Sequence, residues 1–196
     1  DAAGHDVLSV LDGAGIAYTP FTFADAVIKP DEHAAGSLIM HFDAECDAVI
    51  GVGSGVINDC CKILAAKTKR PYIIVASAPS MDGFASDTSS VEIDGLKVSL
   101  PAKSADVIIG DTDILKKAPA RMLSSGVGDM LAKYISIAEW RISALINGEY
   151  FCADIAELIR ASLKKCTDNA EGLLRRDEKA VEAVFEGLVG VGFAMS

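Results

Sequence analysis

Residues 48–59 have the sequence AVIGVGSGVIND, in which an apolar run leads directly into a glycine-rich turn. The run Ala48–Gly53 has the length and the continuous apolar character of a buried strand. Residues 56–69 follow, with apolar side chains at helical spacing. Strand, glycine turn and helix in this order predict one unit of a parallel α/β sheet covered on both faces.

Two further apolar runs extend this pattern along the first part of the chain. Residues 72–76 and 106–110 are short, rich in β-branched side chains and typical of buried strands. Residues 91–100 alternate around an Asp-Gly pair, which predicts a tight β-hairpin. The expected fold of this part is a Rossmann-like parallel sheet with an inserted hairpin.

The second part of the chain has a different pattern. Residues 127–146, 151–170 and 177–196 all show helical periodicity, and no strand candidate lies among them. An α/β part followed by an all-α part predicts two domains. We expect an NAD(P)-binding α/β domain over residues 1–119 and the beginning of a helical metal and substrate domain over residues 120–196.

Both ends of the chain have the pattern of a truncated protein. A helix at about residues 5–14 comes first, with no strand before it, so the first strand of the α/β domain is expected to be missing. The other end lies inside the apolar run 188–195, which needs further protein to pack against.

Composition excludes several classes of function. The net charge of -10 argues against nucleic acid as a partner, because no basic stripe is present to neutralise phosphates. No apolar run reaches the roughly 20 residues that span a bilayer, and no signal pattern begins the chain, so no membrane association is expected. The cysteines lack CxxC spacing and are typical of reduced residues in a cytosolic protein. They are Cys46, Cys60, Cys61, Cys152 and Cys166.

The glycine turn at residues 51–55 is a candidate phosphate site. Glycines let the backbone approach a ligand, and the free N–H groups that open a helix attract anions. The turn departs from the usual dinucleotide fingerprint, since Val56 takes the third glycine position, and it lacks the Gly-Lys-Ser/Thr of a P-loop. A plain strand-to-helix turn is the alternative.

A second candidate loop, SAPSMDGFASDT at residues 77–88, follows the next strand. Because ligands bind at the carboxyl ends of parallel strands, we expect this loop and the glycine turn to face the same cleft. Its hydroxyls suit a cofactor, and its carboxylates suit the hydroxyls of a substrate. The alternative is a polar turn with a helix cap.

A third candidate is Asp129, in the helix start SGVGDMLAKY at residues 125–134. It is either a metal ligand or an acidic group that complements the helix dipole. Lys133 lies four residues later on the same helical face, as an ion-pair partner or as a cation near an anionic substrate.

These loops together resemble one superfamily, that of iron-containing alcohol dehydrogenase, glycerol dehydrogenase and dehydroquinate synthase. Gly53-Ser54-Gly55, with Asn58-Asp59 and Lys62 after it, is similar to its nucleotide loop. Four further motifs narrow the resemblance to bacterial-type sn-glycerol-1-phosphate dehydrogenases over essentially the whole chain. These motifs are SMDGFAS at 80–86, DGLK at 94–97, GDMLAK at 128–133 and EWR at 139–141.

The resemblance implies a cytoplasmic, homodimeric enzyme that reduces dihydroxyacetone phosphate to sn-glycerol 1-phosphate with NADH or NADPH. It also implies a divalent metal, zinc or nickel. The ribose-reading segment, which it places around residues 17–23, has no acidic or basic signature that distinguishes the two cofactors.

The resemblance also implies roles for individual residues. Asp82 would bind substrate, and Asp129 would bind both the metal and substrate, so these two are the candidate catalytic residues. The implied cofactor contacts are Gly53, Ser54, Gly55, Val56, Ile57, Asn58, Asp59, Ser77, Ala78, Pro79, Ser80 and Ser86.

One departure from the family pattern concerns the metal. The family completes its site with two histidines on later helices, whereas His5, His33 and His41 all precede the glycine turn and match no ligand. We therefore expect the remaining ligands beyond Ser196, and an incomplete metal site in this chain alone. The alternatives are a glycerol dehydrogenase acting on unphosphorylated glycerol or dihydroxyacetone, and a catalytically incomplete nucleotide-binding module. A dehydroquinate synthase is disfavoured, because its basic substrate loops are not seen.

Overall fold

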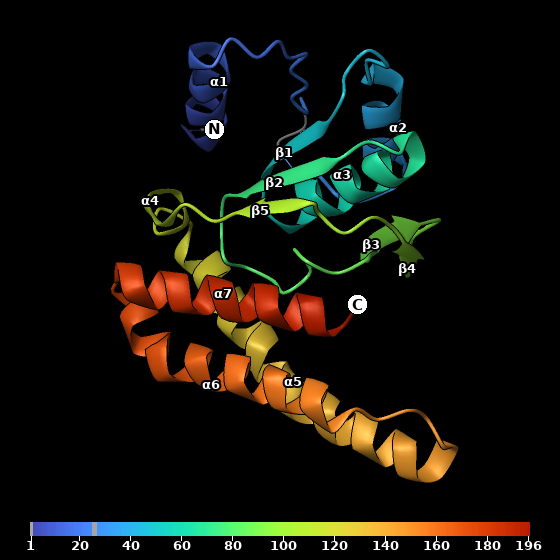
Figure 1. The fold of residues 1–196 in the computed structure, drawn as a ribbon, viewed down its shortest axis with the longest axis vertical. Coiled ribbons are helices and arrows are strands. Elements are labelled where there is room, and N and C mark those ends of the chain that lie inside the picture. Colours follow the sequence, from blue (N-terminus) through green and yellow to red (C-terminus); the bar gives the residue numbers. More distant parts are fainter. Residues whose placement is uncertain (1, 25–26) are drawn as a thin grey trace. The chain divides into compact units, whose positions relative to one another are not determined.

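The structure is a computed structural model that describes residues 2–24 and 27–196. It divides into two compact units. The first comprises Asp1–Ser77 and Ser86–Asp111, and the second comprises Ala78–Ala85 and Thr112–Ser196. The eight residues Ala78–Ala85 therefore belong to the helical unit, although both of their flanking residues belong to the α/β unit (Figure 1).

The first unit is an α/β fold around a three-stranded parallel sheet in the order β1-β2-β5. Strands β3 and β4 form a separate antiparallel hairpin. This confirms the predicted parallel sheet with an inserted hairpin. The elements are α1 (Ala2–Gly13), α2 (Glu32–His41), β1 (Val49–Gly53), α3 (Gly55–Thr68), β2 (Tyr72–Ala76), β3 (Thr88–Ile93), β4 (Leu96–Pro101) and β5 (Val107–Ile109).

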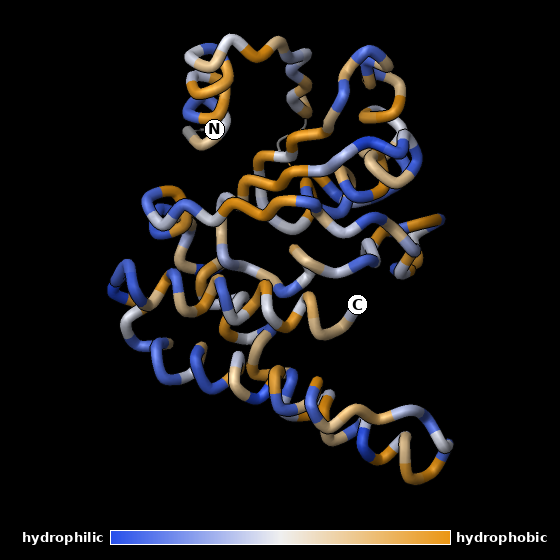
Figure 2. Tube along the Cα trace, in the orientation of Figure 1, coloured by the Kyte–Doolittle hydropathy of each residue, from blue (hydrophilic) through white to orange (hydrophobic). Residues whose placement is uncertain are grey.

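The core of this unit lies between α3 and the sheet. Strand β2 is central and is the most buried strand, while α3 buries the face that runs from Asn58 to Ala65. All three strands are strongly apolar (Figure 2). The expected burial of both faces is met only in part, because Ile50, Val107 and Ile109 stay 38–47% exposed.

The hairpin has the turn that its sequence predicts. Asp94 and Gly95 both adopt positive φ, at 51° and 78°, as a two-residue type I′ turn requires. The turn sets the register, in which Glu92 lies opposite Lys97 and Val91 opposite Val98. Unlike charges and β-branched pairs directly opposite one another stabilise such a ribbon.

The second unit contains α4 (Thr112–Leu115), α5 (Ala120–Asn147), α6 (Ala153–Leu174) and α7 (Glu178–Ala194). Helix α5 buries Leu123, Met130 and Ile137 at seven-residue spacing, so one narrow stripe faces its partners. It begins seven residues before the predicted position 127. The glycines at 126 and 128 weaken the helical pattern there, but packing overrides their low propensity.

Two helices were not predicted, α2 and α4. Helix α2 begins after Asp31, whose Oδ1 accepts a hydrogen bond from the Ala34 N–H at 2.9 Å. An aspartate at this position is a common N-cap, so the start of α2 could have been predicted from the sequence. Helix α4 spans only four residues, which is too short for a periodic pattern. Residues 17–23, the expected ribose-reading segment, form neither a helix nor a strand.

Candidate functional site

The glycine turn joins β1 to α3 in the first unit. Ser54 is the N-cap of α3 and makes no side-chain cap hydrogen bond, so no hydroxyl of that residue satisfies the first-turn N–H groups. A Cβ atom on Gly53 would lie 2.5 Å from Cγ1 of Ile57, so the turn tolerates only glycine at that position. The result is a close-packed backbone turn at the N-terminus of a 14-residue helix, which suits an anion.

Asn58 supports this turn from inside the unit. Its side chain is fully buried, and its Oδ1 accepts a hydrogen bond from the Tyr72 hydroxyl at 3.1 Å. The side chain that the resemblance assigns to the cofactor thus faces the core. Its backbone N–H donates to Ser54 O at 3.0 Å, the first hydrogen bond of α3.

Asp59 links α3 to the hairpin. Its carboxylate accepts a hydrogen bond from the backbone of Ser90, and its carbonyl oxygen accepts one from the Ser89 hydroxyl at 3.2 Å. Burial raises the pKa of Asp59 to about 6, against the lowering effect of the Lys62 charge. The carboxylate is therefore hydrogen-bonded within the protein and changes charge near pH 6.

Lys62 is a fully buried lysine that the sequence analysis noted only as part of a motif. Its Nζ donates to Ser86 Oγ at 2.9 Å and to the Thr88 carbonyl oxygen at 3.0 Å. Ser86 is itself buried, so its hydroxyl is engaged by Lys62 inside the unit. The position of this lysine within the apolar run Cys60–Ala65 was the feature of the sequence that indicated its burial.

Ser77 is anchored to the same turn by its backbone. Its N–H donates to the carbonyl oxygen of Gly53 at 2.9 Å. Ser77 and Ser86 flank the segment Ala78–Ala85. Ser77 is hydrogen-bonded to the glycine turn, and Ser86 is hydrogen-bonded to Lys62 of α3. The two ends of the serine-rich loop are thus fixed in the first unit.

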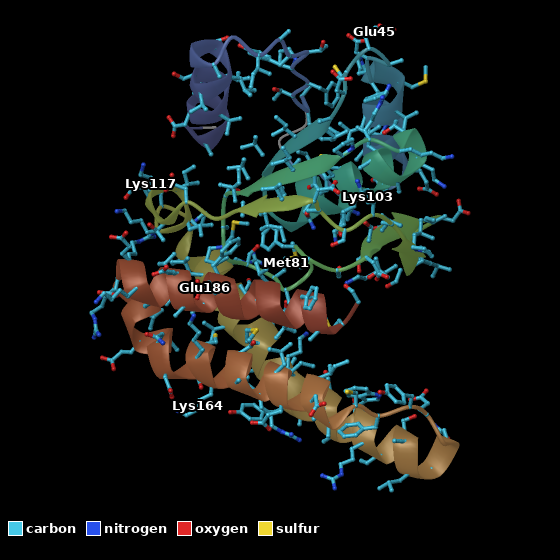
Figure 3. All side chains as sticks on the ribbon, in the orientation of Figure 1. Glu45, Met81, Lys103, Lys117, Lys164 and Glu186 are labelled. Carbon is cyan, nitrogen blue, oxygen red and sulfur yellow. The ribbon has the colours of Figure 1, made fainter. Side chains whose placement is uncertain are left out.

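The segment between these ends packs within the helical unit. Ala78, Phe84 and Ala85 are buried, and the Phe84 ring meets Phe185 of α7 edge-on at 5.4 Å. Figure 3 labels Met81 in this segment. The backbone runs so close to the helices that side chains are excluded at Gly126 and Gly192. A Cβ there would lie 2.0 Å from Pro79 O and 2.1 Å from Asp82 O, respectively.

This packing brings Asp82 together with Asp129 of α5. The Asp82 N–H donates to Asp129 Oδ2 at 2.8 Å. Lys133, one turn further along α5, places its Nζ 2.5 Å from Asp82 Oδ2 and 3.4 Å from Asp129 Oδ1. The helical unit therefore contains a cluster of two carboxylates and one ammonium group, in which Asp82 lies 47 positions before Asp129 in the sequence.

The charges in this cluster depend on one another. Burial is the main cause that raises the pKa of Asp82 above its usual range, and the Asp129 charge adds to it, while Lys133 acts in the opposite direction. Burial alone would lower the pKa of Lys133, but its two carboxylate partners outweigh it and raise that pKa.

The cluster fits only part of a metal site. Within residues 2–24 and 27–196, no three His, Cys, Asp or Glu side chains gather closely enough to hold a metal ion. Divalent metals of the first transition row usually take four or more ligands. Asp82 and Asp129 supply two carboxylates, and the Lys133 ammonium group already pairs with both. His33 and His41 lie on α2 and His5 on α1, in the other unit.

Comparison with known proteins identifies related sequences. The family described as iron-containing alcohol dehydrogenase matches residues 1–119. The chain is 32% identical over 196 residues to a glycerol-1-phosphate dehydrogenase [NAD(P)+] of Halalkalibacterium halodurans, covering 98% of this chain and 49% of that protein. A protein of the same name from Thermococcus sibiricus is 36% identical over 150 residues, 76% of this chain and 43% of its own length. The chain spans about half the length of these curated relatives.

Solved structures share the fold. A glycerol dehydrogenase from Schizosaccharomyces pombe superposes with a TM-score of 0.81 at 23% identity, covering 97% of this chain and 50% of that one. An iron-containing alcohol dehydrogenase from Thermotoga maritima gives 0.78 at 16% identity, covering 97% and 56%. None of the helices in the described part of the chain has the length and apolarity needed to cross a membrane.

Proposed function

Because the chain belongs to the iron-containing alcohol dehydrogenase family, we propose that it is part of an NAD(P)-dependent reductase that converts dihydroxyacetone phosphate to sn-glycerol 1-phosphate. The observation that carries the proposal is the similarity of nearly the whole chain to proteins named glycerol-1-phosphate dehydrogenase [NAD(P)+]. The glycine turn and the Asp82–Asp129–Lys133 cluster supply chemistry of the required kind.

We propose that residues 1–119 serve nucleotide binding and that residues 120–196 begin the part that binds metal and substrate. The compact units divide slightly differently, after Asp111, and the helical unit includes Ala78–Ala85. Asp82 therefore belongs with Asp129 rather than with the glycine turn. This grouping agrees with their shared role toward substrate in the proposal.

The cofactor pyrophosphate would bind at the N-terminus of α3. The backbone of residues 53–59 offers N–H donors and a positive helix end. Ser77, Ala78, Pro79 and Ser80 would contact the rest of the nucleotide. Ser86 would act through Lys62, because that ammonium already engages its hydroxyl.

The substrate would bind at the carboxylate cluster. Asp82 can accept a hydrogen bond from a substrate hydroxyl, and Lys133 offsets one of the two carboxylate charges beside it. The nicotinamide, when bound, would supply the hydride for the ketone carbon, and a proton from solvent would complete the alcohol. No step is assigned to a metal, since the residues present fit only part of its site. Asp129 is our candidate for the ligand that this chain contributes.

The decisive experiment measures NADH and NADPH oxidation by the full-length gene product with dihydroxyacetone phosphate or with dihydroxyacetone. Each reaction is run with and without a chelator. Chelator-sensitive oxidation that needs the phosphorylated ketone supports the proposal. A preference for dihydroxyacetone would make the protein a glycerol dehydrogenase instead, and no oxidation with either ketone would leave a nucleotide-binding module.

Asp129 requires matched variants, because it has a structural hydrogen bond as well as a proposed chemical role. Asp129→Asn keeps an oxygen that can accept the Asp82 N–H, whereas Asp129→Ala loses it. We expect both variants to lose metal-dependent turnover. Only the alanine variant should also lose stability, by about 1 kcal/mol. Full turnover of Asp129→Asn with metal still bound would exclude Asp129 as a ligand.

The remaining parts of the proposal concern the metal, the assembly and the location. We propose zinc or nickel, a homodimer, and a cytoplasmic protein. Metal analysis of the purified protein, light scattering and cell fractionation test these three statements separately.

A further inference from the structure

Lys133 lies between the two carboxylates of the helical unit. Its Nζ is 2.5 Å from Asp82 Oδ2 and 3.4 Å from Asp129 Oδ1. The side chains of Lys133 and Asp82 are only 13% and 14% exposed, and that of Asp129 is 31% exposed. The Coulomb attraction between charges shielded in this way is stronger than the attraction between the same charges in open solvent.

The cluster needs a cation because its backbone holds the acidic groups together. The hydrogen bond from the Asp82 N–H to Asp129 Oδ2 ties the loop to α5, whatever the charge state. The two carboxylates repel one another when both are ionised, because this hydrogen bond keeps them close together. One ammonium offsets part of this repulsion.

We propose that Lys133 is the resident counter-cation of the Asp82–Asp129 pair, and that a divalent cation reaches these carboxylates only in competition with it. The lysine keeps the loop and α5 assembled when no metal is bound. The positive charge of Lys133 repels an incoming dication. Its ammonium group also contacts Asp82 Oδ2 and Asp129 Oδ1, the oxygen atoms that the dication would need as ligands. This inference deepens the metal site of the proposed function, but it rests on the geometry of the cluster.

The competing roles for Lys133 lead to a different result. An ordinary ion pair between residues four positions apart in a helix has little effect on a cation that binds elsewhere. A lysine reserved for the phosphate of a substrate would leave metal affinity unchanged in the absence of substrate. Counter-cation competition alone requires that removing the lysine charge strengthens metal binding.

The test is a Mn²⁺ titration followed by electron paramagnetic resonance, without nucleotide or substrate. Mn²⁺ prefers oxygen ligands, so the cysteines interfere less than they would with zinc. The variants are Lys133→Met, Lys133→Gln and Lys133→Arg. The control is Lys164→Met on α6, where Lys164 makes an exposed ion pair with Asp168 four residues on. Lys164 is labelled in Figure 3.

We expect the methionine and glutamine variants to bind Mn²⁺ about tenfold or more tightly than wild type, because a nearby positive charge is removed. Lys133→Arg and Lys164→Met should match wild type. Adding Asp129→Asn to Lys133→Met should abolish the gain, which would place the bound ion at the pair. Thermal melting in chelator should show Lys133→Met to be less stable than wild type, and Mn²⁺ should restore it.

Unchanged or weaker Mn²⁺ affinity in the neutral variants overturns the proposal, as does the absence of measurable binding in both wild type and variants. If Lys133→Met does not fold, Lys133→Gln decides, because its amide can still donate a hydrogen bond to the carboxylates. The outcome is independent of the proposed reaction, since no turnover is measured. A protein that oxidises no NAD(P)H can still show the competition.

Discussion

The carbonyl oxygen of Pro79 lies where a side chain on Gly126 would begin, at 2.0 Å from the position of its Cβ atom. Helix α5 therefore contacts the loop with bare backbone. Gly128, two residues later on the same helix, has nothing within 4 Å of its Cβ position. These two glycines form a matched pair, because they lie on the same helix and only Gly126 contacts the backbone of another segment.

We expect Gly126→Ala to lower the free energy of unfolding by at least about 3 kcal/mol, because neither backbone can move away without losing its packing. Gly128→Ala should raise it by about 0.5–1 kcal/mol through better helix propensity. Urea denaturation measures both changes. Equal effects of the two substitutions would contradict the close approach.

Phe84 should be a main contributor to the stability of the helical unit. It is fully buried against Phe185, so Phe84→Ala is expected to cost about 3–5 kcal/mol. Phe193 on α7 is 71% exposed, and Phe193→Ala should change stability by less than about 0.5 kcal/mol. Thermal and urea melts compare them. A small loss for Phe84→Ala would show that the loop does not pack in this way.

Ser86→Ala separates a structural from a cofactor-binding serine. The change removes one acceptor of the buried Lys62 ammonium and leaves the Thr88 carbonyl oxygen, so stability should fall by about 1–3 kcal/mol. NADH affinity, measured by fluorescence well below the melting temperature, should change less than in Ser80→Ala. A large loss of NADH affinity with normal stability would restore Ser86 as a direct cofactor contact.

Asp59 predicts a defined pH dependence. The folded protein keeps the proton of Asp59 up to about pH 6, whereas an unfolded aspartate releases it near pH 4. Between these values the folded state binds more protons, so the Asp59 contribution to stability decreases as the pH rises. Asp59→Asn does not titrate and lacks this decrease.

The stability of Asp59→Asn minus that of wild type should therefore rise between about pH 4 and pH 6 and stay constant above. Any constant effect on Lys62 shifts this difference without changing its slope. Urea denaturation at a series of pH values gives the curve. A difference that stays flat over this range would contradict a raised folded pKa of Asp59.

The regular elements were predictable where local pattern and tertiary structure agree. The strand at 72–76 was predicted to the residue, and the Asp-Gly turn of the hairpin was identified from two residues, because both depend on local chemistry. The start of α5 at Ala120 was missed because Gly126 weakens the helical pattern of the sequence. The contact of Gly126 with Pro79, which explains this glycine, is visible only in the folded protein. Helix α2 was missed although Asp31 provides an ordinary N-cap.

The candidate site was predictable in its residue types but not in its grouping. Asp82 and Asp129 were singled out as separate motifs, and their hydrogen bond could not be inferred from spacing alone. Lys62 and Ser86 were noted only as members of motifs, although the position of Lys62 within the apolar run Cys60–Ala65 indicated a buried lysine. Which side chains face a ligand and which face the core depends on long-range packing.

The membership of Ala78–Ala85 in the helical unit has a consequence for protein synthesis. Ser196, at the end of α7, donates through its hydroxyl to the carbonyl oxygen of Ala85, 111 residues earlier. A ribosome that adds roughly 5–20 residues per second leaves Phe84 without Phe185 for about 5–20 seconds. During that interval Phe84 has no partner ring, so the nascent chain should bind chaperones there and be cut by proteases most readily.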